Sequence, residues 1–273
     1  MNATGNTSPS RVSFENVAKT YTGAQGDVKV VDNVSFSLGE GDFVSLIGPS
    51  GCGKTTMLQM LAGFVKPDSG TVTLNGQPVQ GPDSDRGVIF QEYGVFPWLT
   101  VEKNIAFGLT LRRNAKPEAE RKDIVAHYVK LMHLNGFEKA YPKHLSGGMR
   151  QRLALARAYA VNPNILLMDE PFGALDAQTR LALQLQLMEV LTKERKTVLL
   201  ITHSVEEAIF LSNRILMISA RPSRILREID VPFPYPRTPE LTATPDFQRL
   251  RLELEEMSME QYAQQQRLAA ESR

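Results

Sequence analysis

The sequence of 273 residues predicts an α/β fold, with a mostly parallel core sheet, an N-terminal antiparallel β subdomain and a helical subdomain. Three observations support this prediction. Short apolar runs of strand length alternate with helical segments, a pattern typical of parallel strands joined by crossover helices. Near the N-terminus, apolar and polar residues alternate as in antiparallel strands. A glycine-rich turn between a strand and a helix has the spacing of a phosphate-binding loop.

The strands are predicted from apolar runs and turn signals. Residues 11–17 and 34–38 form the antiparallel pair, with the turn-rich residues 21–27 between them. Residues 71–76 contain a short strand that runs into an Asn-Gly hairpin signal. The buried core strands are expected at residues 43–47, 87–90, 165–168 and 198–201.

The helices are predicted from apolar residues at helical spacing and from capping signals. A helix over residues 56–62 ends at Gly63, and a long helix spans about residues 178–194. A short helix begins at Ser204, because Ser204 and Glu207 form a capping-box pattern. The stretch from about residue 91 to 160 is mostly helical, with one apolar face. That face consists of Ile124, Tyr128, Leu131 and Met132.

We expect three regions along the chain. Residues 1–10 form a disordered polar tail, and residues 11–230 form the main domain, with its helical subdomain at about residues 92–160. Residues 231–273 form a proline-rich linker and a C-terminal helix. The apolar stripe of this helix could brace a dimer or pack on its own domain, and we expect packing. The stripe consists of Phe247, Leu250, Leu254 and Met257.

Composition excludes several classes of protein. The 31 Lys and Arg residues nearly balance 30 Asp and Glu, and the net charge of +1 argues against a chain that coats nucleic acid. A single cysteine, Cys52, rules out an internal disulfide framework and suits a reducing compartment. The N-terminus lacks the apolar core of a signal peptide, and the longest apolar runs are too short to span a bilayer. If the protein works at a membrane, another chain must supply the spanning helices.

Residues 48–55 fit the pattern G-x-x-x-x-G-K-[ST] of a phosphate-binding loop. Glycines let backbone N–H groups point at phosphate oxygens, and the following helix presents its positive end. Lys54 would reach the β- and γ-phosphates, and the Thr55 hydroxyl would bind Mg²⁺. A glycine-rich turn that binds nothing is the weaker alternative, because both the strand and the helix context are present. The expected nucleotide-binding residues of the loop are Gly48, Pro49, Ser50, Gly51, Cys52, Gly53, Lys54, Thr55 and Thr56.

Two carboxylates, Asp169 and Glu170, close the apolar strand at residues 165–168. Asp169 is expected beside Thr55, where it would hold Mg²⁺ directly or through water. Glu170 would orient or deprotonate the water that attacks the γ-phosphate. Alone, the pair could merely end a strand, but the phosphate loop favours a catalytic role.

A second anion-binding helix end is predicted at Ser146, Gly147 and Gly148. Ser146 would cap the helix, and the glycines would expose backbone N–H groups. By itself this pattern could equally be a plain capped helix. One ATP molecule has no obvious need for two helix N-termini from the same chain.

At these residues the chain resembles the ATP-binding cassette (ABC) ATPases, which are P-loop NTPases, over residues 11–227. The phosphate loop resembles their Walker A motif, residues 165–170 resemble Walker B, and residues 145–152 resemble the family signature.

Four further residues resemble known family positions. Gln91 matches the Q-loop glutamine, Asp176 the D-loop aspartate and His203 the switch histidine. Tyr21 resembles the aromatic residue that stacks on adenine, although a tyrosine near a strand end could also be a half-buried packing residue.

The resemblance implies an ATPase that uses ATP and Mg²⁺ and forms a head-to-tail dimer with a second copy of itself. Each phosphate loop would face the signature residues Ser146, Gly147 and Gly148 of the other copy. Gln91 would sense Mg²⁺ and the attacking water, and His203 would hold the γ-phosphate in active geometry. The implied catalytic residues are Glu170, His203 and Gln91, and the implied metal-binding residues are Thr55, Gln91 and Asp169.

Two residues depart from the pattern of the family. Met149 stands where many members carry glutamine, and Ala174 replaces a frequent serine of the D-loop. Neither change removes a catalytic group, so both are compatible with activity.

Within the family, residues 96–101 and 170–176 resemble bacterial importers of the nitrate, sulfonate and taurine type, with the nearest resemblance to taurine and aliphatic sulfonate importers. This implies a peripheral protein at the cytoplasmic face of the inner (plasma) membrane. Its partners would be transmembrane permease subunits and, indirectly, a periplasmic solute-binding protein, but no nucleic acid. Trp98, just after Gln91, is expected where the permease docks, although it could also be a core aromatic residue.

Two other functions are weighed against an importer subunit. A non-transport ABC ATPase of the translation or DNA-repair type usually has two cassettes in one chain, or a long coiled coil between phosphate loop and signature. Here about 90 residues separate Lys54 from Ser146, without sustained heptads. A regulatory cassette that binds ATP without turnover is disfavoured by the presence of Glu170 and His203.

Overall fold

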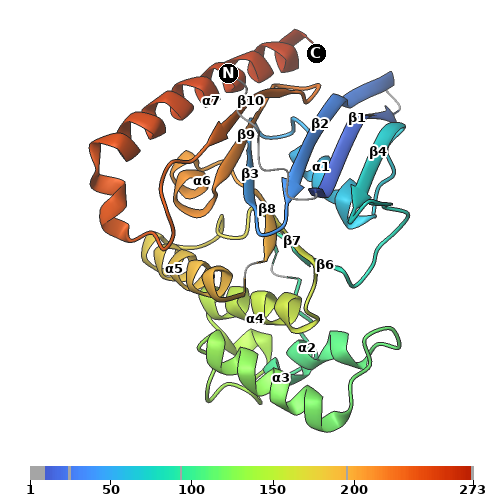
Figure 1. The fold of residues 1–273 in the computed structure, drawn as a ribbon, viewed down its shortest axis with the longest axis vertical. Coiled ribbons are helices and arrows are strands. Elements are labelled where there is room, and N and C mark those ends of the chain that lie inside the picture. Colours follow the sequence, from blue (N-terminus) through green and yellow to red (C-terminus); the bar gives the residue numbers. More distant parts are fainter. Residues whose placement is uncertain (1–9, 24–25, 93, 195, 272–273) are drawn as a thin grey trace, which may run out of the picture. The chain divides into compact units, whose positions relative to one another are not determined.

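The computed structural model describes residues 10–23, 26–92, 94–194 and 196–271 (Figure 1). The chain divides into two compact units, the first formed by Met1–Pro82 with Lys196–Arg273 and the second by Asp83–Arg195. The expected disordered tail falls, except for Ser10, outside the described residues.

The first unit contains an antiparallel sheet with the strand order β2-β1-β4-β5. Strands β1 (Ser10–Gly23) and β2 (Gly26–Gly39) pair along their whole length, and β4 (Ser69–Leu74) lies on the other side of β1. The short β5 (Gln77–Pro78) closes the hairpin that Asn75-Gly76 predicts. The N-terminal antiparallel subdomain is therefore confirmed.

The ribbon of β1 and β2 is longer than the sequence pattern predicts. The turn predicted at residues 21–27 is too long at both ends, because β1 continues to Gly23 and β2 already starts at Gly26. Bulges interrupt the pairing between Phe14 and Val17 and between Val17 and Lys19. A bulge shifts the alternation of side chains between the two faces, so a regular two-residue period breaks off there.

The first unit also contains a run of strands in the order β10-β9-β3-β8. Strand β3 (Phe43–Ile47) is parallel to both β8 (Thr197–Ile201) and β9 (Arg214–Ile218). Strand β10 (Ile225–Asp230) is antiparallel to β9. All residues of β3 and β8 are buried, which explains their continuous apolar runs. Strands β9 and β10 were not predicted from the sequence.

Three helices and a short 3₁₀ turn complete the first unit. Helix α1 (Lys54–Ala62) ends at Gly63, whose φ of 84° is the left-handed cap that the sequence predicts. Helix α6 (Val205–Leu211) starts after Ser204, also as predicted. The 3₁₀ turn η3 (Pro239–Ala243) leads into the long helix α7 (Pro245–Glu271).

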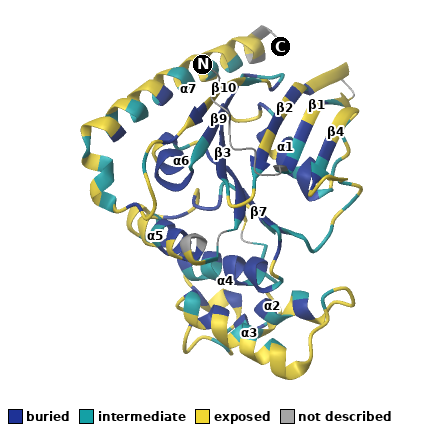
Figure 2. Cartoon of the chain, in the orientation of Figure 1, coloured by how far each residue is buried: buried dark blue, intermediate teal, exposed yellow. Residues whose placement is uncertain are grey.

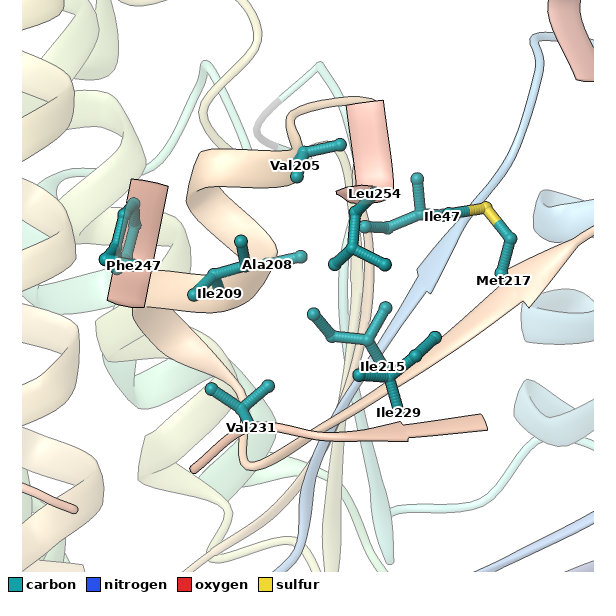
Figure 3. Packing of buried hydrophobic residues seen from close by; sticks show 10 residues of the cluster. All are labelled: Ile47, Val205, Ala208, Ile209, Ile215, Met217, Ile229, Val231, Phe247 and Leu254. Carbon is teal, nitrogen blue, oxygen red and sulfur yellow. The ribbon is translucent and has the colours of Figure 1, made fainter. Parts of the chain in front are cut away.

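Helix α7 packs on the core of its own unit, which confirms the expected packing. Figure 3 shows Phe247 and Leu254 of α7 beside residues of α6, β9 and β10. Both side chains are fully buried, and Leu250 and Met257 pack against the same cluster while partly buried. The proline-rich segment before α7 is anchored by Arg237, which donates hydrogen bonds to the carbonyl oxygens of Ile209, Ser212 and Phe233. The proposed domain boundaries remain a prediction.

The second unit combines a parallel strand pair with a group of helices. Strands β6 (Arg86–Ile89) and β7 (Ile165–Asp169) pair in parallel. Much of the surface of helix α3 (Glu118–Leu131) is exposed, whereas Tyr128, Val129 and the following Met132 are buried (Figure 2). The remaining elements are α2 (Val101–Phe107), η1 (Gly108–Thr110), η2 (Pro142–His144), α4 (Gly147–Ala160) and α5 (Ala177–Glu194). Among the residues that the structure describes, no helix is both long enough and apolar enough to cross a bilayer.

Candidate functional site

The phosphate loop connects β3 to α1 in the first unit. Gly51 and Gly53 have φ angles of 73° and 127°, which L side chains rarely adopt. In the described part of the chain, no side chain caps α1, and its first turn carries no acidic residue. The first N–H groups of a helix have no partner within the helix itself, and the helix dipole favours an anion at this end.

Lys54 lies over the loop that precedes it. Its Nζ atom donates hydrogen bonds to the carbonyl oxygens of Gly48 and Pro49, at 2.8 and 2.9 Å. The side chain is only 5% exposed, so its stem is held in the protein while the ammonium group stays at the loop. An ammonium group has three donors, so this arrangement leaves Lys54 able to reach a phosphate oxygen.

The turn between β9 and β10 contacts the phosphate loop through Ser223. The Ser223 hydroxyl donates a hydrogen bond to the carbonyl oxygen of Cys52. A Cβ atom on Gly53 would lie 2.6 Å from Ser223 Oγ and 2.8 Å from Val30 Cγ1. Gly53 is therefore required by close packing as well as by its φ angle. Ser223 is a residue that sequence reasoning missed, because the contact joins positions 171 residues apart.

His203 follows β8, the strand that neighbours β3. Because β3 and β8 are parallel, both end at the same edge of the sheet, which brings His203 to the phosphate loop. There, His203, Gly48, Pro49 and Ser50 border one cleft of about 760 Å³. The structure thus joins two motifs that lie about 150 residues apart in the sequence.

Helix α7 supplies the opposite wall of this cleft. Its lining residues recur at i, i+3, i+4 and i+7, a second stripe beside the one that packs on the core. Met259 and Tyr262 of this stripe are 66% and 56% exposed. The stripe consists of Glu255, Ser258, Met259 and Tyr262. This stripe was not predicted from the sequence, because two of its four residues are polar.

Tyr21 lies near the end of β1 and is 40% exposed. The ammonium group of Lys19 lies 5.6 Å from the centre of its ring. Lys19 also pairs with Asp68, whose pKa is lowered by that contact and by the N–H of Thr20. The ring face is accessible enough for stacking, but its role with adenine stays a prediction.

The acidic pair closes β7 in the second unit. Glu170 has a φ of 45°, an uncommon conformation for a residue with a side chain, and Gly173 N donates a hydrogen bond to its carbonyl oxygen. Strained backbone of this kind is concentrated at functional sites. Glu170 Oε2 lies 4.0 Å from the position of a Cβ atom on Gly173, so the turn keeps the carboxylate close to its own backbone.

The signature and D-loop motifs form two neighbouring helix starts in the second unit. Ser146 caps α4 by accepting a hydrogen bond from Met149 N, and Asp176 caps α5 by accepting one from Thr179 N. The bond from Thr179 lowers the pKa of Asp176. A Cβ atom on Gly148 would lie 2.5 Å from Thr179 Cγ2, so this glycine lets the two helix ends approach.

Gln91 follows β6 and is exposed, as is Phe90. Trp98 is 69% exposed, so the alternative of a core aromatic residue is wrong. It lies at the edge of an aromatic cluster in which Phe96 packs against Trp98 and Phe107, with ring centres 5.5 and 4.5 Å apart. Arg157 lies 4.9 Å from the centre of the Phe96 ring. The second unit therefore exposes aromatic side chains in the segment that follows Gln91 in the sequence.

The predicted site residues fall into two groups. The phosphate loop, Tyr21 and His203 belong to the first unit, and Gln91, Asp169, Glu170, Asp176 and the signature belong to the second. Hydroxyl, amide and carboxylate oxygens, the types that Thr55, Gln91 and Asp169 carry, are among the ligands that Mg²⁺ prefers. The roles of the individual residues remain predictions.

Comparisons with known proteins agree on one family. A family model described as "ABC transporter" matches residues 31–173. An aliphatic sulfonates import ATP-binding protein of Bacillus cereus is 47% identical over 227 residues, which cover 83% of this chain and 88% of that protein. An uncharacterized ABC transporter ATP-binding protein of Methanocaldococcus jannaschii is 48% identical over 227 residues, covering 83% and 84%.

A solved structure extends the likeness to three dimensions. It is a dimeric ATP-binding cassette in a post-hydrolysis state, bound to ADP and Pi. The TM-score is 0.71 at 33% sequence identity, and the match covers 81% of this chain and 99% of that one. The predicted fold class, with its phosphate loop, is confirmed by this match.

Proposed function

The chain belongs to the ABC transporter ATP-binding family, and we propose that it is the ATP-hydrolysing subunit of a bacterial importer. The observation that carries this proposal is the shared edge of β3 and β8, where the phosphate loop and His203 border one cleft. ATP hydrolysis needs donors for the phosphates and a group that activates water, and the motifs of the chain provide both.

The phosphates would be held by the loop. Backbone N–H groups of residues 48–55 and the start of α1 would bind the phosphate oxygens. Lys54 would exchange its bonds to the Gly48 and Pro49 carbonyl groups for bonds to the β- and γ-phosphates. His203, exposed at the cleft, would donate a hydrogen bond to the γ-phosphate.

Glu170 would act as the general base. Its carboxylate would take a proton from the attacking water as the new P–O bond forms, and the bond between the β-γ bridging oxygen and the γ-phosphorus would break. The products are ADP and inorganic phosphate. Thr55, Asp169 and Gln91 would hold Mg²⁺, which neutralises phosphate charge when bound.

Two copies of the chain would form each pair of ATP sites. The capped start of α4 at Ser146 presents N–H groups that one ATP does not need from the same chain. A head-to-tail dimer would give these groups a ligand, namely the ATP held by the other copy. The dimeric state of the related solved cassette supports this arrangement.

The exposed aromatic cluster around Trp98 would bind the permease subunits at the cytoplasmic face of the inner membrane. Large exposed apolar side chains beside a functional residue are typical of interaction surfaces. The solute would be taurine, an alkanesulfonate, nitrate or a similar small anion, delivered by a periplasmic binding protein. The named substrate of the Bacillus cereus relative supports a sulfonate.

A non-transport function has less support. In the described stretch between the phosphate loop and α4, the longest helix is α3, with 14 residues, which is too short for a sustained coiled coil.

The decisive experiment measures phosphate release and ATP binding by the wild type and by Glu170→Gln. We expect wild-type turnover to rise faster than linearly with protein concentration, because two copies build each site. Glu170→Gln should lose at least about 100-fold in turnover while it still binds ATP. Glu256→Gln, which removes an exposed carboxylate of α7, is the matched control and should behave as wild type. Full turnover by Glu170→Gln would refute the assigned base.

A further inference from the structure

The residues on both sides of His203 form a closed hydrogen-bond network. Thr202 and Glu207 are 1% and 7% exposed, whereas His203 between them is exposed. Thr202 directly follows the last residue of β8, and its N–H donates a hydrogen bond to the carbonyl oxygen of Leu46 in β3 at 3.3 Å. Glu207 lies in the first turn of α6. His203 is thus exposed on a loop whose two ends are buried.

Three hydrogen bonds close this network. The N–H of Ser204 donates to Thr202 Oγ1 at 3.0 Å, and the N–H of Glu207 donates to Ser204 Oγ at 3.2 Å. The Thr202 hydroxyl donates to Glu207 Oε2. The Thr202 hydroxyl therefore accepts a hydrogen bond from the N–H of Ser204 and donates one to the carboxylate of Glu207 in α6.

This arrangement differs from an ordinary capping box. In a capping box, the glutamate at the third helical position bonds directly to the N–H of the capping residue. Here the Thr202 hydroxyl stands between the N–H of Ser204 and the carboxylate of Glu207. The cap of α6 is therefore hydrogen-bonded to Thr202, the residue before His203. Thr202 is in turn hydrogen-bonded to Leu46 in β3, the strand that leads into the phosphate loop.

The network exceeds what the helix requires. Ser204 alone satisfies an N–H group of the first turn of α6. Burying a carboxylate and a hydroxyl is unfavourable unless both are hydrogen-bonded, and here the hydroxyl of Thr202 donates to the carboxylate of Glu207, which fixes the orientation of both groups. The pair thereby orients the backbone on both sides of His203.

We infer that Thr202 and Glu207 are positioning residues, which hold the His203 backbone so that its imidazole stays at the cleft beside the phosphate loop. The inference rests on the proposed role of His203 in ATP hydrolysis. Neither residue touches the cleft, whose lining on this side comes from His203, Ser204, Val205 and Glu206. Their effect on turnover must therefore pass through His203.

The test compares four variants in steady-state ATPase and ATP-binding assays. Thr202→Val removes the hydroxyl at nearly constant shape, and Glu207→Ala removes the carboxylate. Glu207→Gln keeps an oxygen that can accept from Thr202. Ser212→Ala is the matched control, because Ser212 is a buried hydroxyl at the other end of α6 that donates to Ala208 O.

We expect Thr202→Val and Glu207→Ala to lower kcat about 10- to 100-fold, because a small displacement of a catalytic group has effects of this size. The dissociation constant for ATP should change by less than about twofold, since the phosphate loop is intact. Glu207→Gln should keep most of the wild-type kcat, unlike Glu207→Ala, and Ser212→Ala should leave kcat unchanged. If Glu207→Ala does not fold, the loss of kcat is tested by Thr202→Val alone, with Glu207→Gln as the variant that should keep most of kcat.

A double-mutant cycle with His203→Ala separates positioning from general damage. If Thr202 acts through His203, adding Thr202→Val to His203→Ala should lower kcat no further. If the kcat losses of the two single variants multiply in the double mutant, the inference about Thr202 is overturned, while the proposed role of His203 is unaffected. Unchanged turnover by His203→Ala would instead refute the role proposed for His203, and the inference would fall with it.

Discussion

The Nζ atom of Lys54 lies 2.8 Å from the carbonyl oxygen of Gly48, the first residue of its own loop. The bond closes the loop on itself and neutralises part of the carbonyl charge with the ammonium group. A loop that is fixed by its own hydrogen bonds loses less conformational entropy when a ligand binds. We propose that phosphate oxygens of ATP replace the two carbonyl partners of Lys54.

Replacing Lys54 by methionine should weaken ATP binding about 10- to 100-fold, the equivalent of one charge-assisted hydrogen bond. The substitution keeps an apolar stem in a site that is only 5% exposed, so the fold should persist. Titration with a fluorescent ATP analogue measures the change. Lys66→Met, at an exposed lysine, should bind as wild type. Equal affinity of Lys54→Met and wild type would contradict the role of Lys54.

Gly53→Ala should destabilise the first unit and weaken ATP binding. The left-handed φ costs about 1–3 kcal/mol, and forcing Cβ to within 2.6 Å of Ser223 Oγ adds an overpacking cost of similar size. Gly76→Ala is the control, because Gly76 has a φ of 72° but nothing within 4 Å of its added Cβ. Thermal unfolding should place Gly53→Ala clearly below Gly76→Ala, and equal midpoints would argue against the contact with Ser223.

Phe247→Ala should lower the free energy of unfolding by about 3–5 kcal/mol, because it removes a fully buried ring that packs on Phe233 and the α6 cluster. Leu252→Ala, at a position of the same helix that is 59% exposed, should change it by less than about 0.5 kcal/mol. Urea unfolding followed by circular dichroism measures both. A small effect of Phe247→Ala would mean that α7 is not part of the core.

Asp176 should stabilise the protein only above acidic pH. Its pKa in the folded state lies below the ordinary value of 3.8, because its carboxylate accepts a hydrogen bond from Thr179 N. The contribution is therefore complete above that ordinary value and is lost as the pH falls through the lower pKa of the folded state. Wild type and Asp176→Ala should differ in urea midpoint at pH 7 and converge in acid.

Asp176→Asn provides the control for this prediction, because an asparagine can cap α5 without a charge. Its stability should respond less to acid than that of the wild type. If the difference between wild type and Asp176→Ala persisted unchanged in acid, the carboxylate would not be the cause.

Local chemistry was sufficient to predict much of this protein from the sequence. The phosphate loop, the left-handed cap at Gly63, the caps at Ser146 and Ser204 and the antiparallel hairpin at Asn75 depend on neighbouring residues, and each was found where expected. The family was predicted from the resemblance of these motifs to those of ABC ATPases, and comparison with known proteins confirms it.

Tertiary structure decided what depends on distant pairs. The hydroxyl of Ser223 is hydrogen-bonded to the phosphate loop, and residues of helix α7 line the cleft. Thr202 is hydrogen-bonded to Glu207, where the sequence predicts only a capping box. Strands β9 and β10, and the full length of the β1–β2 ribbon, also escaped prediction. The reason is physical: a local sequence pattern predicts that a residue will be buried or hydrogen-bonded, but it does not identify a partner that lies far away in the sequence. Only the folded chain determines which distant residue that partner is.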